Sequence, residues 1–165
     1  MRLRPAVLTD LDQIMIVERA SFGRDSYRTE LLATFLDDPE FYNLVVEEDG
    51  IVVGYVTFYE ETKGSSGRIV SIAVLPQYRM RKLAREMIRA MEEEAKRRNI
   101  GTVTLEVAVA NVPAINLYIS EGYRIEGIIP DYYGKSRNAF YMEKRMPVRS
   151  GEGTGTRRPA RGRRR

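Results

Sequence analysis

The stretch that decides the fold is Ser71-Ile-Ala-Val-Leu-Pro-Gln-Tyr-Arg-Met-Arg-Lys-Leu-Ala84. It joins a β-branched run at residues 68–75, which predicts a strand, to a long amphipathic helix expected at residues 80–98. The first N–H groups of a helix have no partner within it, and the helix dipole favours an anion there. Basic side chains strengthen this field at Arg79, Arg81 and Lys82. The stretch therefore indicates a phosphate-binding turn, although a solvated basic helix start has the same pattern.

The rest of the chain predicts strands interrupted by helices. Strands are expected at residues 2–7, 42–47, 51–60, 68–75, 102–109, 123–129 and 138–146. Helices are expected at residues 11–20, from a cap at Ser26 to before Asp38, at 80–98 and at 111–122. Helical crossovers predict parallel neighbours, whereas Asp49-Gly50 predicts an antiparallel hairpin. We therefore expect an α/β (α+β) fold with a mixed central sheet of about seven strands, flanked by about four helices.

Composition restricts the chemistry that the chain can perform. Its 165 residues fit one domain, and they include neither cysteine nor histidine. Disulfides, thiol nucleophiles, Ser-His-Asp triads and almost every zinc site are thereby excluded, so we expect no metal. A general base must be a carboxylate, a tyrosine, a lysine or a water that one of these positions. No apolar run approaches the roughly 20 residues of a membrane helix, and the start lacks a signal-peptide pattern, so we expect a cytoplasmic protein without a membrane partner.

Charge is distributed unevenly along the chain. Residues 149–165 hold seven arginines and one glutamate, a net charge of +6, whereas residues 1–148 have a net charge of −2. We expect a folded domain at residues 1–148 and a disordered, arginine-rich tail at residues 149–165. Such a tail can serve as a solubilising end, or it can make weak contacts with nucleic acid, a ribosome or an acidic partner.

Several motifs resemble one known family. Ile72-Ala-Val-Leu-Pro-Gln-Tyr-Arg79, followed by a basic loop, resembles the coenzyme-A motif of the GNAT acetyltransferase superfamily. Residues 105–118 and Glu121-Gly-Tyr123 resemble its next strand and helix. Asp131-Tyr-Tyr133 and Asn138-Ala139 complete the pattern of its N-terminal acetyltransferase branch, which includes the bacterial ribosomal-protein alanine acetyltransferases and the archaeal and eukaryotic catalytic subunits. The resemblance implies the GNAT fold for residues 2–147 and acetyl-coenzyme A as the co-substrate.

The resemblance also implies how acetyl-coenzyme A is bound. Backbone groups of Ile72, Ala73 and Val74 would pair with the pantetheine arm as if it were an added strand. Asn111 would contact the co-substrate from the start of its helix. Residues around the long helix's start would hold the pyrophosphate: Arg79, Met80, Arg81, Lys82, Leu83, Ala84 and Arg85. The family has a glycine where Lys82 stands, so we expect the Lys82 side chain to turn outward and add a charge near the phosphates.

Two residues are candidates for the proton transfers. In the bacterial relatives that this segment resembles, the residue matching Glu106 is the base that assists the attacking amine. Strand alternation places Glu106 on one face with Thr104 and Ala108. Tyr118, two helical turns after Asn111 and also in the co-substrate site, is the candidate acid for the departing thiolate. A solvated strand carboxylate and a core tyrosine are the alternatives for Glu106 and Tyr118.

Two loops contain the candidate residues for binding the amine substrate. Asp25-Ser-Tyr27 resembles a Glu-x-Tyr segment that brings a carboxylate, here Asp25, near the amine, and Tyr27 would contact the substrate. Tyr132 and Tyr133 resemble tyrosines that hold the substrate's N-terminal backbone. A polar loop and aromatic packing are the alternatives for these two segments.

These assignments imply direct acetyl transfer, in a ternary complex, to the α-amino group of protein N-termini, including those of ribosomal proteins or nascent chains. One alternative is an acetyltransferase for lysine or a small amine, since only the substrate loops would differ. Another is a non-catalytic acetyl-coenzyme A sensor or a nucleic-acid-associated module, which the lysine at position 82 and the arginine-rich tail favour.

Overall fold

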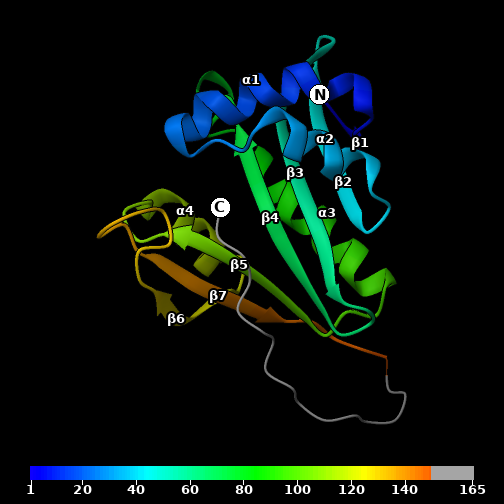
Figure 1. The fold of residues 1–165 in the computed structure, drawn as a ribbon. Coiled ribbons are helices and arrows are strands. Elements are labelled where there is room, and N and C mark those ends of the chain that lie inside the picture. Colours follow the sequence, from blue (N-terminus) through cyan, green and yellow to red (C-terminus); the bar gives the residue numbers. More distant parts are fainter. Residues whose placement is uncertain (150–165) are drawn as a thin grey trace.

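A computed structural model describes residues 1–149. Within them, seven strands form one sheet in the order β1-β2-β3-β4-β5-β7-β6 (Figure 1). The strands are β1 (Arg2–Pro5), β2 (Phe41–Glu48), β3 (Ile51–Thr62), β4 (Ser66–Val74), β5 (Thr102–Ala108), β6 (Arg124–Ile129) and β7 (Ala139–Arg145). The helices are α1 (Leu11–Phe22), α2 (Thr29–Asp37), α3 (Leu83–Arg97) and α4 (Val112–Ser120). The predicted α/β fold, with a mixed seven-stranded sheet and four helices, is confirmed. The predicted tail lies outside the described residues, apart from Arg149.

Strand β4 and strand β5 form the parallel pair of this sheet, and they separate after a short contact. Residues 66–68 lie opposite residues 102–104, after which the two strands diverge and leave a wedge between them (Figure 1). Strand β4 also carries an extra residue, Val70, between the positions that face Thr57 and Phe58 of β3. Such a bulge bends a strand and increases its twist. The wedge is therefore a product of backbone geometry.

The prediction of parallel neighbours across helices is wrong for β1 and β2. These strands are antiparallel, with Arg2 opposite Glu47 and Pro5 opposite Leu44. Two helices, α1 and α2, lie between them. Because the helix pair returns the chain to the end of the sheet that it left, the next strand runs in the opposite direction.

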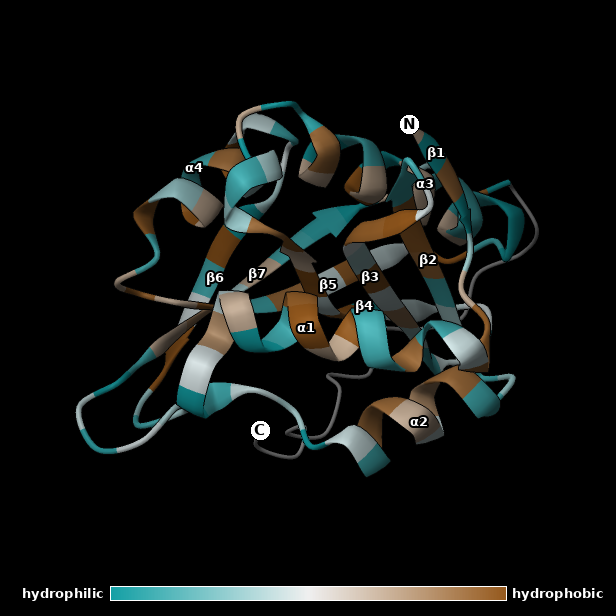
Figure 2. Cartoon of the chain, turned by 90° about the horizontal axis from the view of Figure 1, so that it is seen from above, coloured by the Kyte–Doolittle hydropathy of each residue, from teal (hydrophilic) through white to brown (hydrophobic). Residues whose placement is uncertain are grey.

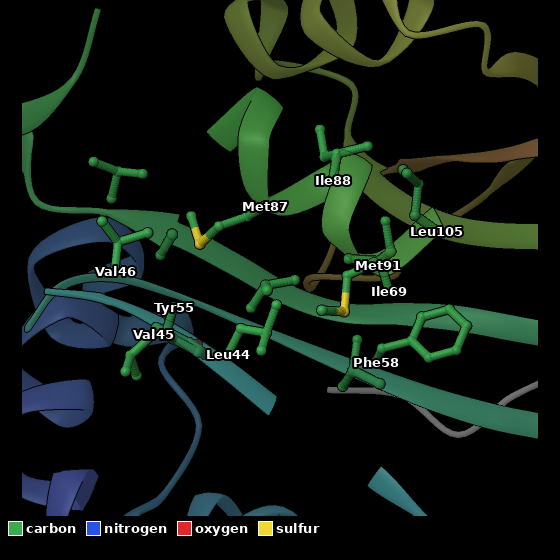
Figure 3. Close-up of a cluster of buried hydrophobic side chains, with 14 of the residues drawn as sticks. Leu44, Val45, Val46, Tyr55, Phe58, Ile69, Met87, Ile88, Met91 and Leu105 are labelled. Carbon is green, nitrogen blue, oxygen red and sulfur yellow. The ribbon is translucent and has the colours of Figure 1, made fainter. Parts of the chain in front are cut away.

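The helices cover both faces of the sheet. Figure 2 shows α1 and α2 along one face and α3 and α4 along the other. The apolar positions of α3 recur every four residues, and each of them is buried: Leu83, Met87, Met91 and Ala95. In Figure 3, the Met87 and Met91 side chains point from α3 into a cluster formed with strand residues such as Phe58 and Ile69. This packing fixes α3 against β3 and β4.

Two helices begin later than predicted. Helix α3 begins at Leu83 instead of residue 80, because Met80 and Lys82 have positive φ angles of 63° and 64°. Helix α2 begins at Thr29, and Ser26 does not cap it. The Ser26 hydroxyl instead donates to the Gly23 carbonyl, at 2.7 Å, in a short turn after α1. Propensity alone did not reveal these turns.

Gly67 is a position where the close contact of β4 with β3 excludes a larger residue. A Cβ there would lie 2.1 Å from the end of the buried Phe58 ring. We expect Gly67→Ala to lower the free energy of unfolding by about 2 kcal/mol, the usual scale of overpacking. Urea denaturation measures this change. Gly127→Ala on β6, where a Cβ meets no atom within 4 Å, is the matched control, and equal losses in the two variants would contradict the clash.

Candidate active site

The candidate site is a cleft in the wedge between β4 and β5. Its walls also include residues from α4, from the segment between α1 and α2, and from the loop between β6 and β7. Six of the residues expected in the site line this cleft: Asp25, Ile72, Glu106, Asn111, Tyr118 and Tyr133. Segments far apart in the sequence therefore meet at the point where the sheet opens.

Glu106 is held by an arginine that sequence reasoning missed. Its carboxylate oxygen Oε2 accepts a hydrogen bond from Nε of Arg68 at 2.8 Å, and the two side chains are 11% and 14% exposed. Arg68 also donates from Nη2 to the Tyr132 hydroxyl at 3.0 Å. The one signal in the sequence was a charged residue at the start of a β-branched strand, and nothing there revealed its partner 38 residues away.

The charges at this point depend on one another. Burial alone would lower the pKa of Arg68, but the nearby Glu106 and Tyr132 raise the pKa above its usual value, so Arg68 stays cationic. Burial raises the pKa of Glu61, and Glu106 raises it further, whereas Arg68 opposes the shift. Burial also raises the pKa of Tyr141, which lies opposite Glu106 on β7. Arg68 is therefore a cation that stabilises the negative charge of Glu106, which lines the cleft.

Tyr118 lines the cleft from α4, and Asn111 lines it from the position just before this helix. The Tyr118 ring is buried and packs edge-on against Tyr123, with ring centres 5.9 Å apart. Asn111 precedes the helix, and its side-chain oxygen accepts a hydrogen bond from the N–H of Ala114 at 3.3 Å. Asn111 is therefore the N-cap of this helix. Glu106 and Tyr118 line the same cleft from two elements, β5 and α4.

Asp25 forms an ion pair with Arg137, and both residues line the cleft. Its Oδ1 accepts from Nη1 of Arg137 at 3.1 Å, and its Oδ2 pairs with Nη2. Arg137 also donates to the Tyr133 carbonyl at 2.6 Å. The hydrogen bond to Asp25 is the main cause of the raised pKa of Arg137. Asp25 thus has a cation beside it, and Arg137, which the sequence did not single out, joins the segment between α1 and α2 to the loop between β6 and β7.

The remaining candidate tyrosines pack beside the cleft. Tyr27 is buried, its ring lies edge-on to Phe35 at 5.6 Å, and its hydroxyl lies 3.5 Å from the Val70 carbonyl. Tyr132 is buried as well and packs edge-on against Tyr133, with ring centres 4.8 Å apart. Of these three tyrosines, Tyr133 lines the cleft itself.

Most cations at the start of α3 are engaged by other parts of the protein. Arg79 donates to the Val74 carbonyl at 3.0 Å, Arg81 pairs with Glu48 at 3.2 Å, and Arg85 pairs with the buried Glu121. Lys82 has an exposed side chain, as expected, and its backbone has the left-handed conformation that glycine adopts without steric cost. This conformation gives a physical reason for a glycine at the matching family position.

The described residues lack the features of two other kinds of site. None of the helices in residues 1–149 is long and apolar enough to span a membrane. Over the same residues, no group of three His, Cys, Asp or Glu side chains is placed to hold a metal ion.

Comparisons with known proteins identify the family. Residues 8–123 match the Acetyltransferase (GNAT) family. An N-alpha-acetyltransferase of Sulfurisphaera tokodaii is 35% identical over 152 residues, which cover 86% of this chain and 90% of that protein. An N-alpha-acetyltransferase of Sulfolobus acidocaldarius is 31% identical over 155 residues, with coverage of 86% and 90%. The crystal structure of the ribosomal-protein-S18-alanine N-acetyltransferase from Escherichia coli shares the fold, with a TM-score of 0.81 at 21% identity over 94% of this chain and 99% of that one. On this match of family, sequence and fold, the chain belongs to the GNAT acetyltransferase family.

Proposed function

We propose that the chain transfers the acetyl group of acetyl-coenzyme A to the N-terminal α-amino group of proteins. The observation that carries this proposal is that Glu106 and Tyr118 line one cleft at the opening between β4 and β5. Acetyl transfer needs a group that takes a proton from the amine and a group that gives one to the departing thiolate. Glu106 takes the first role, directly or through one water, and Tyr118 takes the second. With no cysteine in the chain, the amine attacks the thioester directly in a ternary complex.

The wedge suits the pantetheine arm of acetyl-coenzyme A, the co-substrate of this family. Pairing of β4 with β5 covers residues 66–68, so the edge of β4 at Ile72, Ala73 and Val74 faces the cleft side of the wedge. An extended polar chain can pair with such an edge as an added strand. The α3 start, with Lys82 exposed beside it, then receives the pyrophosphate, and Asn111 contacts the co-substrate from the opposite wall.

An α-amino target agrees with the acid–base groups available. An α-amino group has a pKa near 8 and a lysine side chain one near 10.4, so the α-amino group needs the weaker base. Tyr133 lines the cleft, Tyr132 packs against Tyr133, and the Tyr27 hydroxyl lies 3.5 Å from the Val70 carbonyl of β4, which suits a peptide backbone entering between the loops. Similar proteins named as N-alpha-acetyltransferases support the same target.

Mass spectrometry of paired peptides tests the proposal. One set has free N-termini with varied first two residues, and its partners have a blocked N-terminus and one internal lysine. We expect acetylation of the free N-termini and none of the blocked peptides. Acetylation of lysine alone would contradict the α-amino target, and binding of acetyl-coenzyme A without any product would support a non-catalytic module. A stable acetylated enzyme on the route to product would contradict direct transfer.

Lys82 offers a test of the phosphate site. We expect Lys82→Ala to weaken coenzyme A binding about three- to tenfold at low salt, since a charge-assisted contact contributes about 1 kcal/mol. Isothermal titration calorimetry measures the Kd, and the difference should shrink in high salt because screening weakens the contact. Lys82→Gly removes the same charge but also removes the steric cost of the left-handed backbone at this position. It should therefore bind coenzyme A about as tightly as Lys82→Ala does, and it should unfold at a higher denaturant concentration than Lys82→Ala. Unchanged affinity in both variants would contradict the role of the charge.

A further inference from the structure

Glu18 is a fully buried carboxylate on the inner face of α1. It occupies the same helix stripe as Leu11 and Ile14, where an apolar residue is expected. Within residues 1–149 no basic side chain forms an ion pair with it. Burial of a carboxylate is costly unless it is well hydrogen-bonded, so its partners indicate what it does.

The hydrogen bonds of Glu18 lead to the Tyr27 segment and, through Tyr55 of β3, to Ser71 in the cleft lining. Oxygen Oε1 accepts from the backbone N–H of Tyr27 at 2.8 Å, in the segment between α1 and α2. Oxygen Oε2 accepts from the Tyr55 hydroxyl, and the Tyr55 and Ser71 hydroxyl oxygens lie 2.8 Å apart. Tyr55 and Ser71 are both buried, and Ser71 lines the cleft next to Ile72. One chain of hydrogen bonds therefore runs from β4, through β3, to the substrate loop.

We propose that Glu18, through Tyr55 and Ser71, is a positioning residue that fixes the Tyr27 segment relative to β4. This inference rests on the proposed function, because it assigns the Tyr27 segment to the amine substrate and β4 to acetyl-coenzyme A. Both carboxylate oxygens of Glu18 accept a hydrogen bond in this network. A buried network whose polar groups are all hydrogen-bonded specifies one arrangement of the elements that it joins. Loss of the network should misplace the peptide and leave co-substrate binding on β4 intact.

Steady-state kinetics of four variants tests the proposal. Tyr55→Phe removes the hydroxyl that joins Glu18 to Ser71, and we expect the KM for peptide to rise about five- to tenfold, with the Kd for acetyl-coenzyme A changed less than twofold. Glu18→Leu should have a larger effect. Glu18→Gln keeps an oxygen for the Tyr27 N–H and an NH2 group for the Tyr55 hydroxyl. Its KM for peptide should therefore be close to that of the parent chain. The matched control is Thr57→Val on the same strand, which removes another buried hydroxyl, hydrogen-bonded to Asn43 at 2.7 Å.

Hydrogen exchange provides a readout that needs no substrate. The Tyr27 amide should exchange at least tenfold faster in Glu18→Leu than in the parent chain, and Glu18→Gln should restore its protection. If the parent acetylates no peptide, the proposed function fails, and the exchange result still decides the role of Glu18. Equal peptide KM values in Tyr55→Phe and Thr57→Val, or an unchanged Tyr27 amide in Glu18→Leu, would overturn the proposal.

Discussion

Replacement of Glu106 by glutamine is expected to lower turnover at least about 100-fold, the lower end of what a general base contributes. Glutamine keeps the size of the side chain and an oxygen for Arg68 Nε, so the cleft should keep its shape. It cannot take a proton from the amine. The Kd for acetyl-coenzyme A should change less than twofold, because the proposed role of Glu106 is to act on the amine. Single-turnover kinetics with saturating acetyl-coenzyme A separates the chemical step from binding.

The control for this change is Glu126→Gln. Glu126 is an exposed carboxylate on β6, outside the cleft lining. The turnover of Glu126→Gln should therefore match that of the parent chain. A parental rate and pH–rate profile in Glu106→Gln would show that Glu106 is not the base. A rise in the KM for acetyl-coenzyme A with unchanged turnover would assign Glu106 to binding instead.

Removal of Arg68 should destabilise the protein more than removal of any surface charge. Arg68→Met leaves the Glu106 carboxylate, 11% exposed, without its cation. Breaking a buried ion pair in this way costs about 3 kcal/mol of unfolding free energy. Turnover should fall as well, because the carboxylate loses its orientation and Tyr132 loses a hydrogen bond. Urea denaturation measures the first effect and initial rates the second.

A double-mutant cycle tests whether the Arg68–Glu106 ion pair accounts for this loss of stability. In Arg68→Met combined with Glu106→Gln, no unpaired charge is buried, so the double variant should be more stable than Arg68→Met alone. Arg81→Met is the surface control, because its pair with Glu48 is largely exposed and should contribute less than about 1 kcal/mol. Stability losses that simply add in the double variant would contradict an energetic coupling between Arg68 and Glu106.

Local patterns of the sequence predicted the elements but not the wedge between them. The four-residue apolar repeat of α3 and the alternation of β5 are local properties, and both are present in the structure. The end of β4–β5 pairing after Arg68 is not local, since a strand pattern does not say where its pairing stops. The left-handed Lys82 delays the start of α3, and propensities favour an earlier start.

The sequence predicted residues of the candidate site but not the ion pairs that they form. The resemblance indicated Glu106, Tyr118 and Asn111, which line one cleft. Arg68 and Arg137 were not indicated, because their partners are 38 and 112 residues away along the chain. Glu18 carried a local signal, a carboxylate on an apolar helix stripe. Such long-range pairs depend on the packed fold, which one sequence without an alignment does not reveal.

The short pairing of β4 with β5 has a consequence for how new specificities can arise. Residues of β4 and β5 line one part of the cleft, and two loops joined through Asp25 and Arg137 line another. Loops tolerate replacement and insertion far better than central strands do. Exchange of the two loops can therefore present a different amine to the same thioester, and the architecture divides the chain into an inherited catalytic frame and a replaceable entrance.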